Sequence, residues 1–170
     1  MTSLTTKYTE LYIGNSSDIE EKKLQEEIKE KLILKGWELI GREYLVIDNY
    51  SQFGVGDLIF KKDNKIGVVE CKYINLNESG KNQSTKRTKA RKKVKEQTIY
   101  YSTCAKLKHR DCIVIGATYT NESDLQIICK FKSLEKAKNI FMSILREKHY
   151  KKSSFNQEIY KTLKKLITLE

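Results

Sequence analysis

No stretch of this sequence approaches the roughly 20 consecutive apolar residues that cross a bilayer as a helix. The first residues, MTSLTTKYTELY, have neither the basic nor the apolar segment of a signal peptide. Both absences argue against a membrane or secreted protein, and we expect an intracellular one, in the cytoplasm or the nucleus. With 39% hydrophobic and 32% charged residues, the 170-residue chain has the composition of one soluble domain with a real core.

Metal-binding spacings of cysteine and histidine are also missing. The four cysteines, at positions 71, 104, 112 and 129, form no CxxC pair. The two histidines, His109 and His149, lie near basic residues and show no ligand spacing. The pattern argues against a zinc or iron–sulfur site and favours reduced, packed thiols.

Acidic residues are absent from positions 81–95, whereas both signs of charge are mixed elsewhere in the chain. This stretch contains eight basic residues and so accounts for most of the net charge of +11. They are Lys81, Lys86, Arg87, Lys89, Arg91, Lys92, Lys93 and Lys95. A solvated helix face would explain such a run, but a contact with the phosphate backbone of a nucleic acid explains it better.

The spacing of apolar residues predicts a single domain, residues 1–170, of the α/β (α+β) class. Leu24, Ile28 and Leu32 form one helical stripe that Gly36 ends. The predicted order is α-β-β-β-α-β-β-α-α, with a mixed central sheet flanked by helices. We expect helices at 18–35, 87–107, 133–147 and 154–168, and strands at 37–47, in a hairpin around 63–64, at 111–119 and at 124–131.

Two parts of the chain lie outside the core that we expect at about 18–120. Residues 1–15 form either a polar arm or a short edge strand. Residues 133–170 form a helical extension with an apolar stripe that packs on the domain or on a second subunit of a homodimer. The stripe consists of Phe155, Ile159, Leu163 and Leu166.

The segment GVGDLIFKKDNKIGVVECKYI, residues 54–74, reads as a β-hairpin with Asp63 and Asn64 at its turn. This register places Asp57 directly opposite Glu70. Lys72 lies on the same face, because side chains two apart in a strand share a face. The opposite face carries the core candidates Leu58, Phe60, Val69 and Cys71.

Opposed carboxylates destabilise a strand pair unless one takes up a proton or a cation lies between them. Oxygen ligands suit Mg²⁺, which usually binds one or two protein carboxylates together with water and phosphate oxygens. A neighbouring lysine can position or help to deprotonate the attacking water, or balance charge in the transition state. The hairpin therefore predicts a magnesium site for phosphate chemistry at Asp57, Glu70 and Lys72, in preference to an ordinary solvent-facing Glu–Lys pair.

Gly56–Phe60 and Val68–Lys72 together resemble the PD-(D/E)XK, or restriction-endonuclease-like, nuclease superfamily. Gly56 stands where the motif usually has proline. The resemblance implies a restriction-endonuclease-like core and a metal-dependent phosphodiesterase. Asp57, Glu70 and the backbone carbonyl of Cys71 would bind Mg²⁺, with Mn²⁺ as a substitute, and Lys72 would serve the water.

The superfamily often adds a glutamate from the first helix, which here is Glu21, with Glu20 and Glu27 as alternatives. Glu21 would then join the metal ligands, unless it is only a surface charge near a helix N-terminus. The first helix followed by Gly36 and Trp37 is also similar to the archaeal type of Holliday-junction resolvase.

Gln97 and Tyr101 lie four residues apart on the expected basic helix. They resemble an additional motif of the RecB-like nucleases, in which they would orient the substrate or the region of the active-site lysine. The alternative is structural, with Tyr101 packed against Val94 and Ala105 while Gln97 lies at the rim.

The leading hypothesis is a Mg²⁺-dependent endonuclease that cleaves duplex or branched DNA. The alternatives are a nucleic-acid-binding module with an inactive nuclease fold and a nuclease directed at RNA. The residues expected to contact the nucleic-acid backbone are Lys86, Arg87, Lys89, Arg91, Lys92, Lys93 and Lys95.

Overall fold

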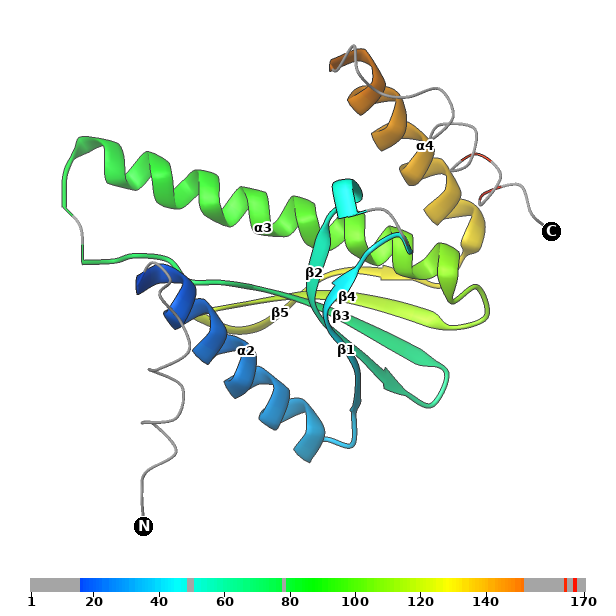
Figure 1. Ribbon diagram of the computed structural model, residues 1–170, viewed down its shortest axis with the longest axis horizontal. Coiled ribbons are helices and arrows are strands. Elements are labelled where there is room, and N and C mark those ends of the chain that lie inside the picture. The colour runs from blue at the N-terminus through cyan, green and yellow to red at the C-terminus, as the bar shows by residue number, and fades with distance from the viewer. Residues whose placement is uncertain (1–15, 49–50, 78, 152–163, 165–166, 168–170) are drawn as a thin grey trace.

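A computed structural model describes residues 16–48, 51–77 and 79–151, together with Lys164 and Ile167. These residues form three α-helices, one short 3₁₀ helix (Ser51–Phe53) and a five-stranded mixed sheet (Figure 1). The predicted class, a mixed sheet flanked by helices, is confirmed at this level. None of the helices in the described part combines the length and the apolar character that a membrane-crossing helix needs.

The five strands lie in the sheet in the order of the chain, β1-β2-β3-β4-β5. All neighbours are antiparallel except β3 and β4, which are parallel and are joined by the long helix α3 (Lys81–Lys108). A parallel pair needs such a crossover because both strands start at the same end of the sheet, so the chain must return to that end before the second strand begins. The strands are β1 (Glu38–Leu45), β2 (Val55–Lys62), β3 (Lys65–Lys72), β4 (Ile113–Thr120) and β5 (Ser123–Phe131).

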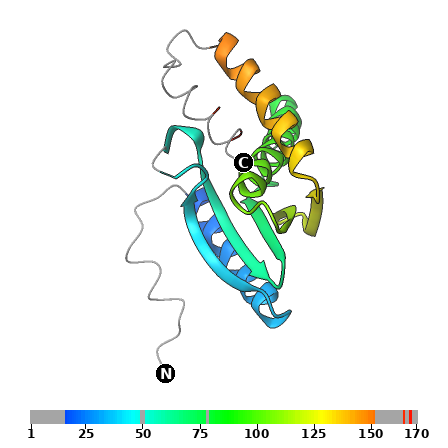
Figure 2. The ribbon, with the colours of Figure 1, turned by 90° about the vertical axis from the view of Figure 1, so that its right-hand side faces the viewer.

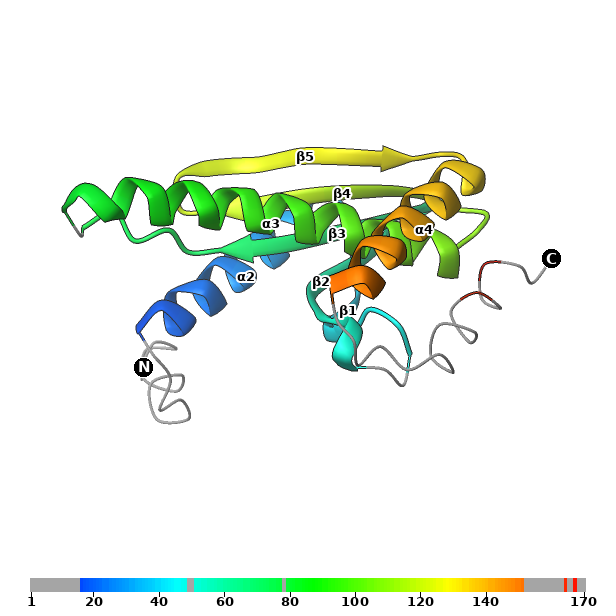
Figure 3. The same cartoon turned by 90° about the horizontal axis from the view of Figure 1, so that it is seen from above.

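Helices cover both faces of the sheet (Figure 2). Helix α2 (Ser16–Leu34) packs its buried stripe of Leu24, Ile28 and Leu32 on one face. Helix α3 covers the other face, and α4 (Leu134–Lys151) packs against α3. Seen from above, α3 runs along the sheet above β3 and β4 (Figure 3). The helical stripe expected in the first helix is confirmed.

The hairpin of β2 and β3 has the predicted register. Lys62 pairs with Lys65 and Leu58 with Val69, and Asp63 has the positive φ (52°) that the tight turn requires. The face expected to be core is buried against α2 through Leu58, Phe60, Val69 and Cys71. The face that carries Glu70 is turned toward α3.

The element boundaries differ from the prediction mainly at α3, which begins at Lys81 rather than near residue 87. Gly80 has a φ of 137° and precedes a run without any helix-breaking residue, so the helix starts as soon as the chain leaves Gly80. The helix α4 extends to Lys151, beyond the expected end at 147. The polar arm or edge strand predicted for 1–15 and the stripe from Phe155 to Leu166 lie outside the described residues.

Candidate active site

Asp57 and Glu70 face each other where the ladder between β2 and β3 ends. The last ladder pair is Leu58 with Val69, and the next position brings Asp57 and Glu70 together. The backbone N–H of Asp57 donates to Glu70 Oε1 at 3.2 Å, and that of Cys71 donates to Asp57 Oδ2 at 2.6 Å. Each carboxylate thus has one oxygen in a bond to the opposite strand. The predicted opposition of the two acids is confirmed.

The two carboxyl groups are held in an environment that disfavours their charged forms. Glu70 is only 4% exposed, and burial, followed by the charge of Asp57, raises its pKa to about 9. Burial also raises the pKa of Asp57 to about 6, although the N–H of Cys71 works in the opposite direction. Near neutral pH the pair therefore retains a proton, unless a cation balances a second negative charge.

Lys72, at the end of β3, forms an ion pair with a residue of α2. Its Nζ lies 2.6 Å from Glu21 Oε2, and the same oxygen accepts from the N–H of Tyr73 at 3.4 Å. The other two helical candidates lie elsewhere, because Glu20 pairs with Lys23 and Glu27 bonds Lys31 and Tyr119. Of the three glutamates, only Glu21 reaches the site.

A pocket of about 130 Å³ lies where these groups meet. Glu21, Asp57 and Glu70 contribute to its walls, and Lys72 lines it as well. Helix α3 closes it with side chains that include Lys93 and Gln97. Elements distant in the sequence therefore converge on one small polar cavity, and five of the six predicted catalytic residues line it.

Tyr101, the sixth of these residues, lies behind the pocket wall. Its side chain is 5% exposed and forms a hydrogen bond with that of Gln97, as the spacing of four residues allows. Its hydroxyl lies only 2.5 Å from where a Cβ would be at Gly54, so the loop before β2 passes directly over this ring. Tyr101 thus supports Gln97 and the entrance to β2 rather than facing the pocket itself.

Tyr44, on β1, is a neighbour of the site that the sequence did not reveal. It pairs with Gly56, and a Cβ on Gly56 would lie 2.5 Å from the tyrosine ring. This contact explains why glycine stands at the position that the resembled motif fills with proline. The Tyr44 hydroxyl is buried without a hydrogen-bond partner among the described residues, and burial, followed by the charge of Glu70, raises its pKa.

The residues present fit a hard divalent cation with two carboxylate ligands. Asp57 and Glu70 each retain one oxygen without a cross-strand bond, and a cation bound between them would offset the burial that raises the pKa of both groups. The four-ligand set implied by the resemblance is not assembled, because Glu21 is bonded to Lys72. Among the described residues, no three Cys, His, Asp or Glu side chains are grouped as metal ligands.

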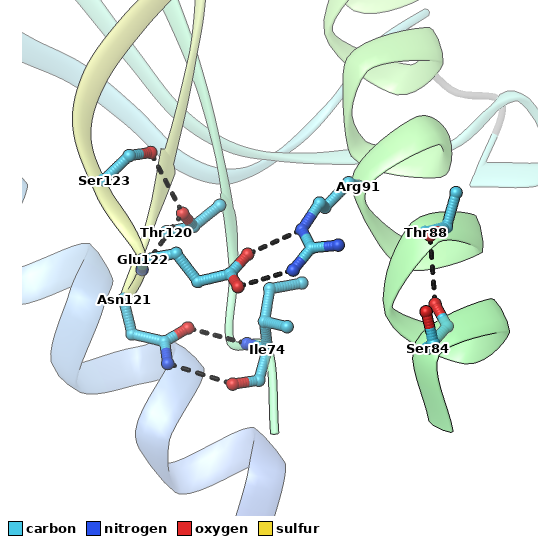
Figure 4. A network of polar contacts seen from close by, with 8 residues as sticks. All are labelled: Ile74, Ser84, Thr88, Arg91, Thr120, Asn121, Glu122 and Ser123. Atoms are coloured by element: carbon cyan, nitrogen blue, oxygen red, sulfur yellow. Dashed lines mark hydrogen bonds and ion pairs between the residues drawn. The ribbon is translucent and has the colours of Figure 1, made fainter. Parts of the chain in front are cut away.

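The basic residues expected to contact phosphate all lie on α3, but their surroundings differ. Lys93 is in the pocket wall. Arg91 is held by two bonds to Glu122, at 2.7 and 2.6 Å, in the turn between β4 and β5 (Figure 4). Lys92 lies 3.7 Å from Glu96. Among these seven residues, Arg91 is the one most firmly engaged within the protein.

Comparison with known proteins adds no relative to this picture. No protein-family model matches the chain, and no curated protein is significantly similar to it. The chain is an α+β protein with a five-stranded mixed sheet, and its candidate site is defined by its own geometry.

Proposed function

We propose that the protein is a Mg²⁺-dependent nuclease that hydrolyses phosphodiester bonds in DNA, built on a restriction-endonuclease-like core. One observation carries the proposal: the buried carboxylate of Glu70 and the partly buried carboxylate of Asp57 face each other at a pocket that also holds a lysine. Like charges placed this way cost stability, and a site for a divalent cation explains why they are together.

Asp57 and Glu70 are the residues that would hold Mg²⁺, through the oxygens left free by the cross-strand hydrogen bonds. When bound, the ion would supply Lewis-acid polarisation of a phosphate oxygen and a more acidic water. The burial of Glu70 and the partial burial of Asp57 strengthen the attraction of both groups for positive charge.

Lys72 has the position required of the group that serves the attacking water. Its Nζ lies at the pocket, and Glu21 fixes it there through the 2.6 Å ion pair. A protonated amine in this place orients a water by donating to it and offsets the negative charge that develops at the phosphate. Glu21 is therefore a positioning residue for Lys72 in this proposal.

A nucleic-acid-binding module without catalysis is the competing function. The same basic helix would serve it, but binding alone gives no reason to keep Asp57 opposite Glu70 in a buried position. The choice of DNA over RNA rests on the resemblance described above, because contacts to the phosphate backbone are common to both.

The test is to incubate the wild-type chain with labelled duplex DNA, single-stranded DNA, four-way junctions and RNA, each in Mg²⁺, Mn²⁺ or EDTA. We expect cleavage that requires a metal and is lost in Lys72→Ala. The matched control is Lys132→Ala, which removes an exposed lysine beyond β5. Tight binding without cleavage in either metal would favour the binding module, and cleavage of RNA alone would correct the substrate.

A further inference from the structure

The positive charges of α3 lie on different flanks of the helix. Arg91 donates two hydrogen bonds to Glu122, and the positive charge of Arg87 helps to lower the pKa of the same carboxylate. Both arginines thus balance the negative charge of Glu122 in the turn between β4 and β5. The lysines nearest the active site lie on another flank, where Lys93 lines the pocket.

The arginine flank belongs to a network that fixes α3 relative to the end of β3 (Figure 4). Next to Glu122, the side chain of Asn121 accepts from the N–H of Ile74 at 2.7 Å and donates to its carbonyl at 2.9 Å. One turn therefore holds both the segment that follows Lys72 and the helix above it. The Nε–Nη2 edge of Arg91 is engaged within the protein, and the charge of Arg91 is balanced by Glu122. Arg91 therefore attracts a phosphate less strongly than a lysine without an ion-pair partner does.

The pocket flank of α3 carries a row of lysines. Lys86, Lys89 and Lys93 fall within about 60° of one another around the helix axis, because each residue advances the direction by about 100°. They extend over about 10 Å, at about 1.5 Å per residue. All three are exposed and have no ion-pair partner among the described residues. Lys93, at the inner end, is part of the pocket wall.

We propose that one strand of the nucleic acid lies along Lys86, Lys89 and Lys93 and is led by them into the pocket, while Arg91 holds the helix in place and does not contact phosphate. The inference rests on the proposed function for the identity of the ligand. The lysine row neutralises consecutive phosphates and sets the register of the strand without reading bases. The Arg91–Glu122 pair keeps this row aligned with the carboxylates.

The same helix supplies a matched control. Lys81, Lys92 and Lys95 also lie within about 60° of one another, and their centre is about 120° around the helix axis from that of the pocket row. They are exposed, and their replacement by glutamine changes the net charge by the same amount. A comparison of the two triple variants therefore separates binding along the row Lys86, Lys89 and Lys93, which we call the track, from a general attraction to positive charge.

Binding of a short labelled DNA duplex is measured in EDTA, by fluorescence anisotropy, between about 50 and 200 mM salt. We expect Lys86→Gln/Lys89→Gln/Lys93→Gln to weaken binding on the order of 10- to 100-fold and to reduce the slope of log K against log salt by about 2 to 3. The control triple should weaken binding only a few-fold with little change in slope. Equal losses in the two triples would overturn the track.

Single variants extend the test to Arg91. Arg91→Gln should leave the salt slope close to that of Lys95→Gln, whereas Lys93→Gln should reduce it by about 0.9. A reduction for Arg91→Gln as large as that for Lys93→Gln would show that Arg91 contacts phosphate. Thermal melting of each variant checks that it is folded.

The track and the proposed nuclease activity fail separately. If the wild-type chain cleaves nothing in any metal but the pocket-flank triple still loses binding selectively, the track stands and the enzyme does not. If cleavage is observed and the two triples behave alike, the enzyme stands and the track does not.

Discussion

Two regions of the molecule bury ionisable groups, and they satisfy them in opposite ways. At the end of α3, Lys106 is 2% exposed and donates to the carbonyls of Arg110 and Cys112, each at 2.7 Å. At the end of β3, Glu70 is 4% exposed and faces a second acid, Asp57. The lysine completes hydrogen bonds that the fold needs. The carboxylates face each other, and the Mg²⁺ of the proposed function would balance their charge.

The comparison predicts its largest effect for Lys106→Met. The methionine fills similar space but leaves two part-buried carbonyls without the Lys106 donor, so we expect a loss of unfolding free energy on the order of 3 kcal/mol. Chemical denaturation measures it, and DNA cleavage by the folded variant should be unchanged at low temperature. A variant as stable as wild type would show that Lys106 is not the structural counterpart of the carboxylate pair.

Glu70→Gln should raise the free energy of unfolding, whereas Lys106→Met lowers it. The pKa of Glu70 is raised by burial and by Asp57 to about 9 in the folded protein, so between about pH 4.5 and pH 9 the native state holds a proton that the unfolded state releases. The stability of the metal-free wild type should therefore fall as pH rises through this window. Glutamine removes the penalty and should stabilise the protein at pH 7 on the order of 2 kcal/mol.

Denaturation curves from pH 5 to pH 9 in EDTA compare wild type and Glu70→Gln. The control is Glu20→Gln, which removes an exposed carboxylate of α2. It should leave the pH dependence of wild type unchanged. A steep pH dependence that persists in Glu70→Gln would mean that other groups cause it.

Addition of Mg²⁺ should raise the free energy of unfolding of the wild type, because the ion would balance the charge of the carboxylate pair. Binding to the native state alone stabilises it by about 1.4 kcal/mol at a concentration about ten times Kd. The effect should be greater at pH 8 than at pH 6, because the pair of Asp57 and Glu70 must lose its proton to bind the ion. Thermal melting with and without Mg²⁺ measures it, and a shift of equal size in Glu70→Gln would place the ion elsewhere.

The smallest effect is expected from two tyrosine hydroxyls. Tyr119 donates to Glu27 at 2.6 Å and accepts from Lys31 at 2.9 Å, whereas the buried hydroxyl of Tyr44 has no partner among the described residues. Tyr119→Phe should therefore cost about 1 kcal/mol and Tyr44→Phe less than about 0.5 kcal/mol. A larger loss for Tyr44→Phe would indicate that its hydroxyl bonds a group in solution.

The hairpin could be predicted from the sequence because its information is local. A two-residue turn at Asp63 and Asn64 fixes every pair in the ladder, so the opposition of Asp57 and Glu70 followed from counting. The stripe of the first helix was equally accessible, since the period of the buried residues is set by helix geometry alone.

Contacts between distant segments could not be predicted in the same way. The pairing of Lys72 with Glu21 depends on where α2 crosses the sheet, so Glu20 and Glu27 remained alternatives to Glu21 until that packing was known. The approach of the Tyr44 ring to Gly56 has no signal except the missing proline. The separation of Arg91 from its neighbouring lysines depends on Glu122, which is 31 residues further along the chain.

Asp57→Asn tests the central claim most directly, because it keeps the shape of the side chain and removes the charge. Cleavage of labelled duplex DNA in Mg²⁺ is followed for wild type and for this variant, together with DNA binding in EDTA. We predict that cleavage falls by at least about 1,000-fold, a loss of about 4 kcal/mol in transition-state stabilisation, while binding stays within a few-fold. Cleavage that persists at the wild-type rate would contradict the assignment of the opposed carboxylates as the metal site.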